Sequence, residues 1–339
     1  MHKNIHMTEH NFSEIGKVEA ISNLYEGTPY SPSRTCSTGT SEIKDVISSS
    51  RIFQEGIDFD LVYFPLKHLG YKCVISVTGE IYAEMAHPSS LCVIMGVSAK
   101  LDFSHIKEIW QGIVTAAKEH GYSQVSLDLV PSRNGLTISV SATGLRSFLT
   151  GKRRSQAHSK DLICISGALG AAYMGLQVLE REKKNFDVNA SAQPALETYR
   201  MLVGSYLRPE LDPGTVSALE NAEIYPSYGM FITNGLSDSI LHLSKLSGFG
   251  AKIYADKIPF EGNTFQLGKE INIDPISAAM NGGDDLRLLF VIPILSLERF
   301  RRDFQTFDII GHLALPEAGT TLVTPDGVEL PLKAQGWRE

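Results

Sequence analysis

One stretch of the sequence combines glycines and carboxylates in a way that could hold a charged ligand. In GGDD (282–285), two glycines permit a tight turn, and two adjacent acids concentrate negative charge just before an apolar run. This arrangement suits a cation or a polar ligand. The alternative is an ordinary turn whose acids are solvated.

Two further stretches could hold a phosphate. In SGALG (166–170) and TNG (233–235), an apolar run passes through a polar turn into an amphipathic segment. Amides exposed at a helix N-terminus attract phosphate, helped by the helix dipole. For the first stretch the alternative is close strand–helix packing. For the second it is a helix N-cap, with Ser237 or Asp238 capping the helix.

Asp128 is a fourth candidate, because it interrupts an apolar run. It lies between Leu127 and Leu129, and a carboxylate buried there without a partner would be costly. We therefore expect Asp128 to be paired, exposed at a sheet edge, or a ligand.

The elements that must position these groups alternate between strands and helices in both halves of the chain. Helical periodicity predicts helices over 11–25, 105–121 and 168–184, and apolar runs predict strands over 91–98, 123–130, 136–144 and 161–167. Further on, we expect a strand, turn and helix at 229–248, a turn feeding a strand at 278–293, and a hairpin at 321–332. The alternation favours α/β or α+β halves.

Three segments are less regular. Residues 27–50 are rich in Ser, Thr, Pro and Gly, which predicts a loop. Residues 71–86 are apolar enough to be buried, but their pattern does not separate strand from helix. The basic, polar stretch 150–160 predicts a domain boundary, with domains over 1–150 and 151–339.

Composition limits the classes of partner. The net charge is −7, with no long basic block, which argues against nucleic acid or an anionic membrane. The N-terminus is too polar for a signal peptide, and no apolar run approaches the roughly 20 residues of a membrane helix. Four cysteines without a CxxC pair favour reduced thiols in a cytoplasmic protein.

Several motifs in order resemble the thiamine-monophosphate kinase family, of the aminoimidazole-ribonucleotide-synthetase-like ATP-binding superfamily. They are DLVYFPLKHLGYK (60–72), DLICISGALGAAYMGLQVLERE (161–182), NGGDDLRLLFVIP (281–293) and LKAQGW (332–337). The resemblance implies an α/β N-terminal domain, whose sheet pairs across a homodimer into a barrel, and an α+β C-terminal domain. It also implies ATP, Mg²⁺ and phosphoryl transfer to thiamine monophosphate, giving thiamine diphosphate.

The family's metal-binding acids map poorly onto this chain. Its early acidic motif falls on TCSTGTSEI (35–43), and its next acid falls on Arg51. Glu80 and Asp128 keep an acid at two other motifs, so the resemblance makes them the catalytic and metal candidates. Arg51 would not bind magnesium, but its guanidinium could meet a phosphate directly.

The resemblance also assigns nucleotide and substrate residues. Asn234 replaces an acid of the family, and Asp238 is displaced by one position from another, which falls on Ser239. The cofactor-binding candidates are Arg51, Trp110, Arg154, Asn234 and Asp238. The substrate-binding candidates are Asp58, Asp284 and Trp337. Trp110 as a core residue and Arg154 as a linker charge are the alternatives.

Two functions follow from this mapping. The first is a thiamine-monophosphate kinase-like protein with weak or lost catalysis, because acids are missing from at least four motifs that converge on one site. The second is a non-catalytic paralogue that binds a nucleotide or phosphorylated ligand or regulates an active relative. The sequence leaves open whether the dimer forms with itself or with a relative.

Overall fold

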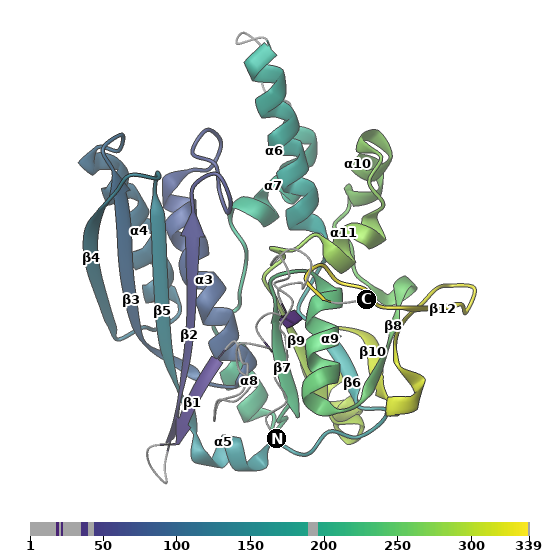
Figure 1. Cartoon of the computed structure of the whole chain (residues 1–339). Coiled ribbons are helices and arrows are strands. Elements are labelled where there is room, and N and C mark those ends of the chain that lie inside the picture. Colours follow the sequence, from purple (N-terminus) through teal and green to yellow (C-terminus); the bar gives the residue numbers. More distant parts are fainter. Residues whose placement is uncertain (1–17, 20–21, 23–34, 40–43, 189–195, 338–339) are drawn as a thin grey trace, which may run out of the picture.

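The computed structural model describes residues 18, 19, 22, 35–39, 44–188 and 196–337, and for 35–39 and 44 it describes the backbone alone. Two β-sheets stand on either side of a helical layer (Figure 1). Of the helix predicted over 11–25, residues 18, 19 and 22 are helical, and the rest lies outside the described residues. Among the helices described, none is long and apolar enough to cross a bilayer.

The first sheet has five strands in the order β1-β2-β5-β3-β4. Their bounds are β1 Thr35–Gly39, β2 Lys44–Gln54, β3 His87–Ser98, β4 Gln124–Ser132 and β5 Thr137–Ser147. The β3–β4 pair is parallel and the other pairs are antiparallel. Strand β5 alternates buried and partly exposed residues, so one face of the sheet packs on helices and the other faces outward.

The loop predicted over 27–50 is wrong where the structure describes it, because β1 and most of β2 lie there. Strand β2 pairs with β5 along all of its 11 residues. Its inward positions include Ile47, Ser49 and Phe53, which are buried, and Ser50 points outward. Small polar residues on a strand gave a loop-like composition. Residues 27–34 and 40–43 lie outside the described part.

Helix α3, Leu66–Ala83, settles the ambiguous stretch 71–86 as a helix up to residue 83. It packs against β2 and β5 of the first sheet and against β7 (Tyr228–Ile232) and β9 (Arg287–Ile292) of the second. It is therefore buried on nearly all sides, which explains why its sequence lacks an amphipathic period. Close approach of the second sheet is visible at Gly79, where an added Cβ would lie 2.2 Å from the Phe231 ring.

Helix α4, Phe103–Glu119, crosses α3 and confirms the helix predicted over 105–121. Its inward face carries Ile109 and Ile113, which are fully buried. Gly121 follows in the left-handed region at φ +75°, as a residue that ends a helix often does.

The second sheet has seven strands in the order β12-β11-β8-β10-β6-β9-β7. Its remaining strands are β6 Leu162–Ile165, β8 Gly250–Tyr254, β10 Asp308–Ala314, β11 Thr320–Val323 and β12 Glu329–Pro331. Alternate residues serve two cores: Cys164 and Phe290 pack on the α3 side, and Ile163 and Val291 on the opposite side. The predicted hairpin at 321–332 is confirmed as β11 and β12.

The remaining helices belong to the part of the chain after β5, and the first of them packs against β2 and β5 of the first sheet. They are α5 Phe148–Arg153, α6 Ala171–Val188, α7 Arg200–Leu207, α8 Thr215–Asn221, α9 Leu236–Ser247, α10 Thr264–Ile271, α11 Pro275–Asn281 and α12 Leu297–Asp303. Four short 3₁₀ helices lie at Glu197–Tyr199, Ala255–Lys257, Ile294–Ser296 and Pro316–Ala318. The predicted helices at 168–184 and within 229–248 correspond to α6 and α9.

The two sheets come from residues on either side of the predicted boundary at 150. One hydrophobic cluster nevertheless runs from Ile47 in the first sheet to Ile292 in the second, through α3. The division into two folding units therefore remains a prediction.

The crossing of α3 and α4 depends on Gly70 and Gly112, and this can be tested. A Cβ at Gly70 would lie 2.0 Å from the Ile109 carbonyl oxygen, and one at Gly112 would lie 1.9 Å from the Lys67 carbonyl oxygen. We expect Gly112→Ala to lower the free energy of unfolding by about 1–3 kcal/mol, because the helices must separate. The matched control is Gly204→Ala in α7, where a Cβ meets no atom within 4 Å. That change should raise stability by about 0.4–1 kcal/mol. Denaturant unfolding of both variants checks this, and shifts of the same sign would contradict it.

Candidate functional site

Lys72 lies in the helical layer between the two sheets, and its side chain is 2% exposed. Among the described residues, it is the only lysine or arginine that is buried. Its Nζ donates to the Tyr206 carbonyl oxygen at 3.0 Å and to the Asp284 Oδ2 at 3.1 Å. It also lies 3.8 Å from the centroid of the Tyr206 ring. Burial lowers the pKa of Lys72, and the Asp284 carboxylate opposes this shift. The ammonium is thus held by one anion, one carbonyl and one aromatic face.

Asp284 lies between two cations. Its Oδ1 accepts from the Arg51 Nη2 at 3.4 Å, while its Oδ2 accepts from Lys72. Burial raises its pKa, but Lys72 and Arg51 outweigh this and hold the pKa of Asp284 below its usual value. The residue adopts φ +60°, and its N–H donates to the Thr233 carbonyl oxygen at 2.8 Å. The GGDD turn is therefore fixed against the TNG turn.

Asp285 fills the other turn that could have bound phosphate. It is 4% exposed, and its carboxyl oxygens accept from the Gly170 N–H at 2.8 Å and the Ala172 N–H at 3.2 Å. Burial raises the pKa of Asp285 to about 7. The SGALG amides at the start of α6 thus already hold an acid of the chain itself. Neither acid of GGDD matches the alternative of a solvated turn.

The TNG turn brings three predicted residues together. Asp238 is buried, its Oδ1 accepts from the Trp337 Nε1 at 2.9 Å, and its Oδ2 accepts from the Asn234 Nδ2 at 3.3 Å. His242 lies one helical turn on, with its ring against Trp337 at 4.8 Å between centroids. Asn234, Asp238 and Trp337 therefore form one cluster beside Thr233, whose carbonyl fixes Asp284.

The alternative that a side chain caps α9 is wrong. Gly235 occupies the N-cap at φ +94° and no side chain caps the helix there. A Cβ at Gly235 would lie 2.5 Å from the Met280 carbonyl oxygen, so close packing on the end of α11 requires glycine. Asp238 instead points to Asn234 and Trp337.

Asp128 and Glu80 lie apart. Asp128 is exposed on the edge strand β4, where its Oδ1 accepts from the Leu129 N–H, and it pairs with Ile94 on the outward face. Glu80 lies on α3, which covers the inward face. Of the three possibilities for Asp128, the structure gives the exposed edge.

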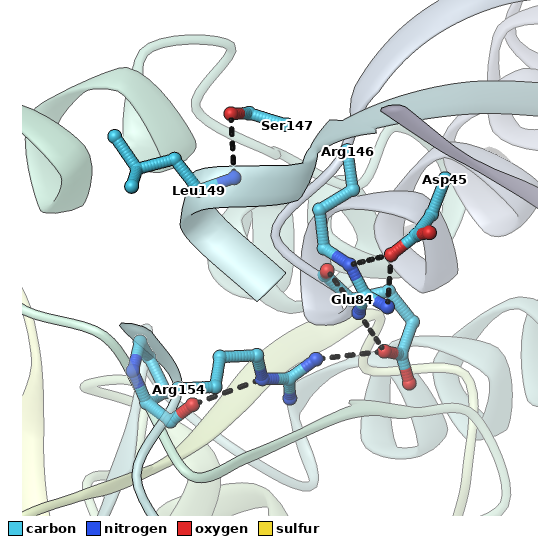
Figure 2. A network of polar contacts seen from close by, with 7 residues as sticks. Asp45, Glu84, Arg146, Ser147, Leu149 and Arg154 are labelled. Atoms are coloured by element: carbon cyan, nitrogen blue, oxygen red, sulfur yellow. Dashed lines mark hydrogen bonds and ion pairs between the residues drawn. The ribbon is translucent and has the colours of Figure 1, made fainter. Parts of the chain in front are cut away.

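Arg154 lies in a polar network that joins the two halves of the chain (Figure 2). Its Nη1 donates to the Glu84 Oε2 at 2.8 Å and its Nε to the Pro226 carbonyl oxygen at 3.1 Å. Glu84 also accepts from Arg146, which binds Asp45 as well. These contacts give Arg154 a structural position between α3 and the strand β7 region.

The two remaining candidates have structural surroundings too. Trp110 on α4 packs against the main hydrophobic cluster, which is the core alternative. Asp58 lies near Lys72 and its partner Tyr206, because the Tyr206 hydroxyl donates to the Asp58 carbonyl oxygen at 3.2 Å. Its carboxylate accepts from the Gln54 N–H at 2.8 Å.

Magnesium does not fit the acids that converge here. Mg²⁺ prefers several carboxylate and water oxygens in near-octahedral geometry. Asp284 already faces two cations, Asp285 accepts from two backbone amides, and Asp238 accepts from an indole and an amide. Within the described ranges, no three His, Cys, Asp or Glu residues are grouped so as to hold a metal ion.

Sequence reasoning missed Lys72, Tyr206 and His242. Lys72 carried a usable signal, because it is the only charged residue between Lys67 and Glu80 in an otherwise buried run. A buried lysine needs an anionic partner, and the two acids of GGDD were candidates for that partner. Tyr206 and His242 carried no comparable signal, since their roles depend on packing between distant segments.

Comparison with known proteins shows what the chain is similar to. No protein-family model matches it. Thiamine-monophosphate kinase of Aquifex aeolicus is 24% identical over 284 residues, 83% of this chain and 86% of the relative. That of Pyrococcus horikoshii is 29% identical over 273 residues, 79% and 78% of the two chains.

Solved structures agree with this similarity. The structure of AaThiL complexed with AMPPCP and TMP superposes with a TM-score of 0.80 at 22% identity, over 97% of this chain and 98% of that one. A HypE–HypF complex gives 0.62 at 16% identity, over 88% and 92%. These similarities confirm the predicted resemblance and the aminoimidazole-ribonucleotide-synthetase-like fold with mixed α and β content.

The buried carboxyl of Asp285 predicts a pH dependence of stability. The pKa is about 7 in the folded chain and about 3.9 in an unfolded one. Unfolding therefore releases a proton between about pH 4 and pH 7, and the free energy of unfolding falls as the pH rises through this window. Over this pH range, the free energy of unfolding of the natural protein should fall by up to about 4 kcal/mol more than that of Asp285→Asn, at about 1.4 kcal/mol per pKa unit. Urea unfolding at pH 4.5 and pH 8 checks this, and parallel pH profiles would contradict it.

Proposed function

We propose that this chain, as a member of the thiamine-monophosphate kinase family, binds a nucleotide or a phosphorylated small molecule of the thiamine monophosphate class. We further propose that it transfers the phosphoryl group of ATP weakly or not at all. The observation that carries the proposal is the position of Asp284, whose carboxylate is neutralised by Lys72 and Arg51.

The reasoning rests on the chemistry of phosphoryl transfer. Enzymes catalyse it almost entirely by positioning the reactants and by neutralising charge, and metal ions held by acids supply much of that neutralisation. Here the acids that converge at the three turns are engaged by groups of the protein. A ligand can still meet cationic side chains, but the donor set for a metal is absent from the described residues.

A second candidate function is a non-catalytic binding or regulatory paralogue. Arg154 favours it, because the arginine proposed for ATP phosphates already donates to Glu84 and to Pro226 (Figure 2). In that case Arg154 fixes the two halves of the chain, and ligand binding has a regulatory role.

We also propose that the outward face of the five-stranded sheet is where a second copy of the chain pairs with it. Ile52 and Ile94 lie on this face in one cross-strand row with Ser139 and Asp128, and they are 51% and 46% exposed. Exposed branched side chains on such a face support an interface between copies.

The interface can be tested by charge. We expect Ile94→Glu to reduce the dimer to a monomer in sedimentation velocity, because it would place a second carboxylate beside Asp128 between the two sheets. Val188→Glu, at an exposed helix end, is the matched control and should leave the mass unchanged. A natural protein that is monomeric at micromolar concentration would sink this part of the proposal.

The kinase activity can be measured directly. Purified protein is incubated with Mg²⁺, ATP and thiamine monophosphate, and thiamine diphosphate is quantified by chromatography. We expect a rate at least about 1,000-fold below that of the Aquifex aeolicus enzyme in the same assay, a deficit of the size that follows from losing charge stabilisation. Turnover within about tenfold of that enzyme would contradict weak catalysis. Calorimetric titration with ATP and thiamine monophosphate, without measurable binding of either, would contradict the binding proposal.

A further inference from the structure

Arg51 has unused hydrogen-bonding capacity at the edge of the charged cluster that it forms with Asp284 and Lys72. Among the residues that the structure describes, its guanidinium donates one hydrogen bond, from Nη2 to the Asp284 Oδ1 at 3.4 Å. Charge-assisted bonds of this kind are usually about 2.7–2.9 Å long, so this one is loose. The side chain is 25% exposed, and its guanidinium carbon lies 5.2 Å from the centroid of the Phe53 ring. Most of its five N–H donors therefore remain free for a ligand.

Lys72 lies on the opposite, closed side of Asp284. It is 2% exposed, compared with 27% for Asp284, and its bonds to Asp284 and to the Tyr206 carbonyl are 3.1 and 3.0 Å long. Asp284 thus has one tight, buried partner and one loose, accessible partner. If Arg51 turns to another anion, the Lys72–Asp284 pair stays intact and no buried charge loses its partner.

The charges of the cluster favour an incoming anion. Lys72, Arg51 and Asp284 together carry one net positive charge, in a partly enclosed place where electrostatic interactions are stronger than in water. The nearby Asp58 carboxylate accepts from the Gln54 N–H. Guanidinium pairs with phosphate oxygens through two parallel hydrogen bonds, which one carboxylate oxygen at 3.4 Å does not offer.

We propose that Arg51 binds the phosphate group of a small phosphate monoester without a metal ion, in exchange for its loose contact with Asp284. This inference rests on the proposed function and specifies how its ligand is held. The exchange makes Asp284 a competitor of the ligand, whereas in a metal-dependent site an acid at this place would assist binding.

The test is calorimetric titration of the full chain with thiamine monophosphate, and separately with inorganic phosphate, in the presence of EDTA. Arg51→Gln should weaken binding about 10- to 100-fold, because two charge-assisted hydrogen bonds are lost. Arg51→Lys keeps the charge but loses the planar guanidinium, so its affinity should lie between those of the natural protein and Arg51→Gln. Asp284→Asn should tighten binding severalfold, because the competing charge is gone. Arg133→Gln, at an exposed arginine outside the cluster, is the matched control and should bind as the natural protein does.

The variants also guard against loss of folding. Thermal unfolding and circular dichroism establish whether each variant is folded. The affinities of the natural protein, Arg51→Lys and Arg51→Gln, expected to decrease in that order, are compared for folded protein only. Binding of thiamine monophosphate that is unchanged in both Arg51 variants would overturn this inference and leave the proposed function standing. Binding that requires Mg²⁺, or that weakens in Asp284→Asn as much as in Arg51→Gln, would also overturn it. Absence of binding to any probe, with or without Mg²⁺, would overturn both.

Discussion

The pairing of Lys72 with Asp284 is the interaction on which the centre of the molecule depends. Helix α3 lies between two sheets and is buried on nearly all sides, so its one interior cation has no access to water. Leaving such a charge without its partner costs about 3–5 kcal/mol. The partner comes from the second half of the chain, more than two hundred residues away. This ion pair thus ties the GGDD turn to α3, and α3 lies between the two sheets (Figure 1).

The acids of the candidate site are paired with hydrogen-bond donors of the protein itself. Asp285 accepts from the amides at the start of α6, Asp284 accepts from two cations, and Asp238 accepts from Trp337 and Asn234. Hydrogen bonds within the protein therefore join the GGDD turn to the SGALG and TNG turns. The fold is similar to that of the solved relatives, while these three acids are engaged by other groups of the protein. Arg51 is accessible, because its side chain is 25% exposed.

Much of this could be predicted from the sequence, for reasons that particular residues make clear. Helix α4 was predictable because its apolar face repeats with a helical period, and Gly121 marks its end. Strand β2 was not, because small Ser residues on a strand resemble those of a loop. The resemblance assigned Asn234 and Asp238 to the cofactor and Trp337 to the substrate, so the contact of Trp337 with Asp238 was not predicted. The roles of Asp285 and Lys72 could not be derived, because they depend on which anion meets which cation across the fold.

The most direct measurement is a crystal structure of the protein soaked with MnCl₂ and a phosphate monoester, with the anomalous signal of manganese recorded. We expect phosphate density against the Arg51 guanidinium and an intact Lys72–Asp284 pair. We expect no manganese peak within coordination distance of Asp284, about 2.2 Å for an oxygen ligand of a divalent ion of this kind. A manganese ion bound by Asp284, with Arg51 turned away from the phosphate, would contradict this expectation.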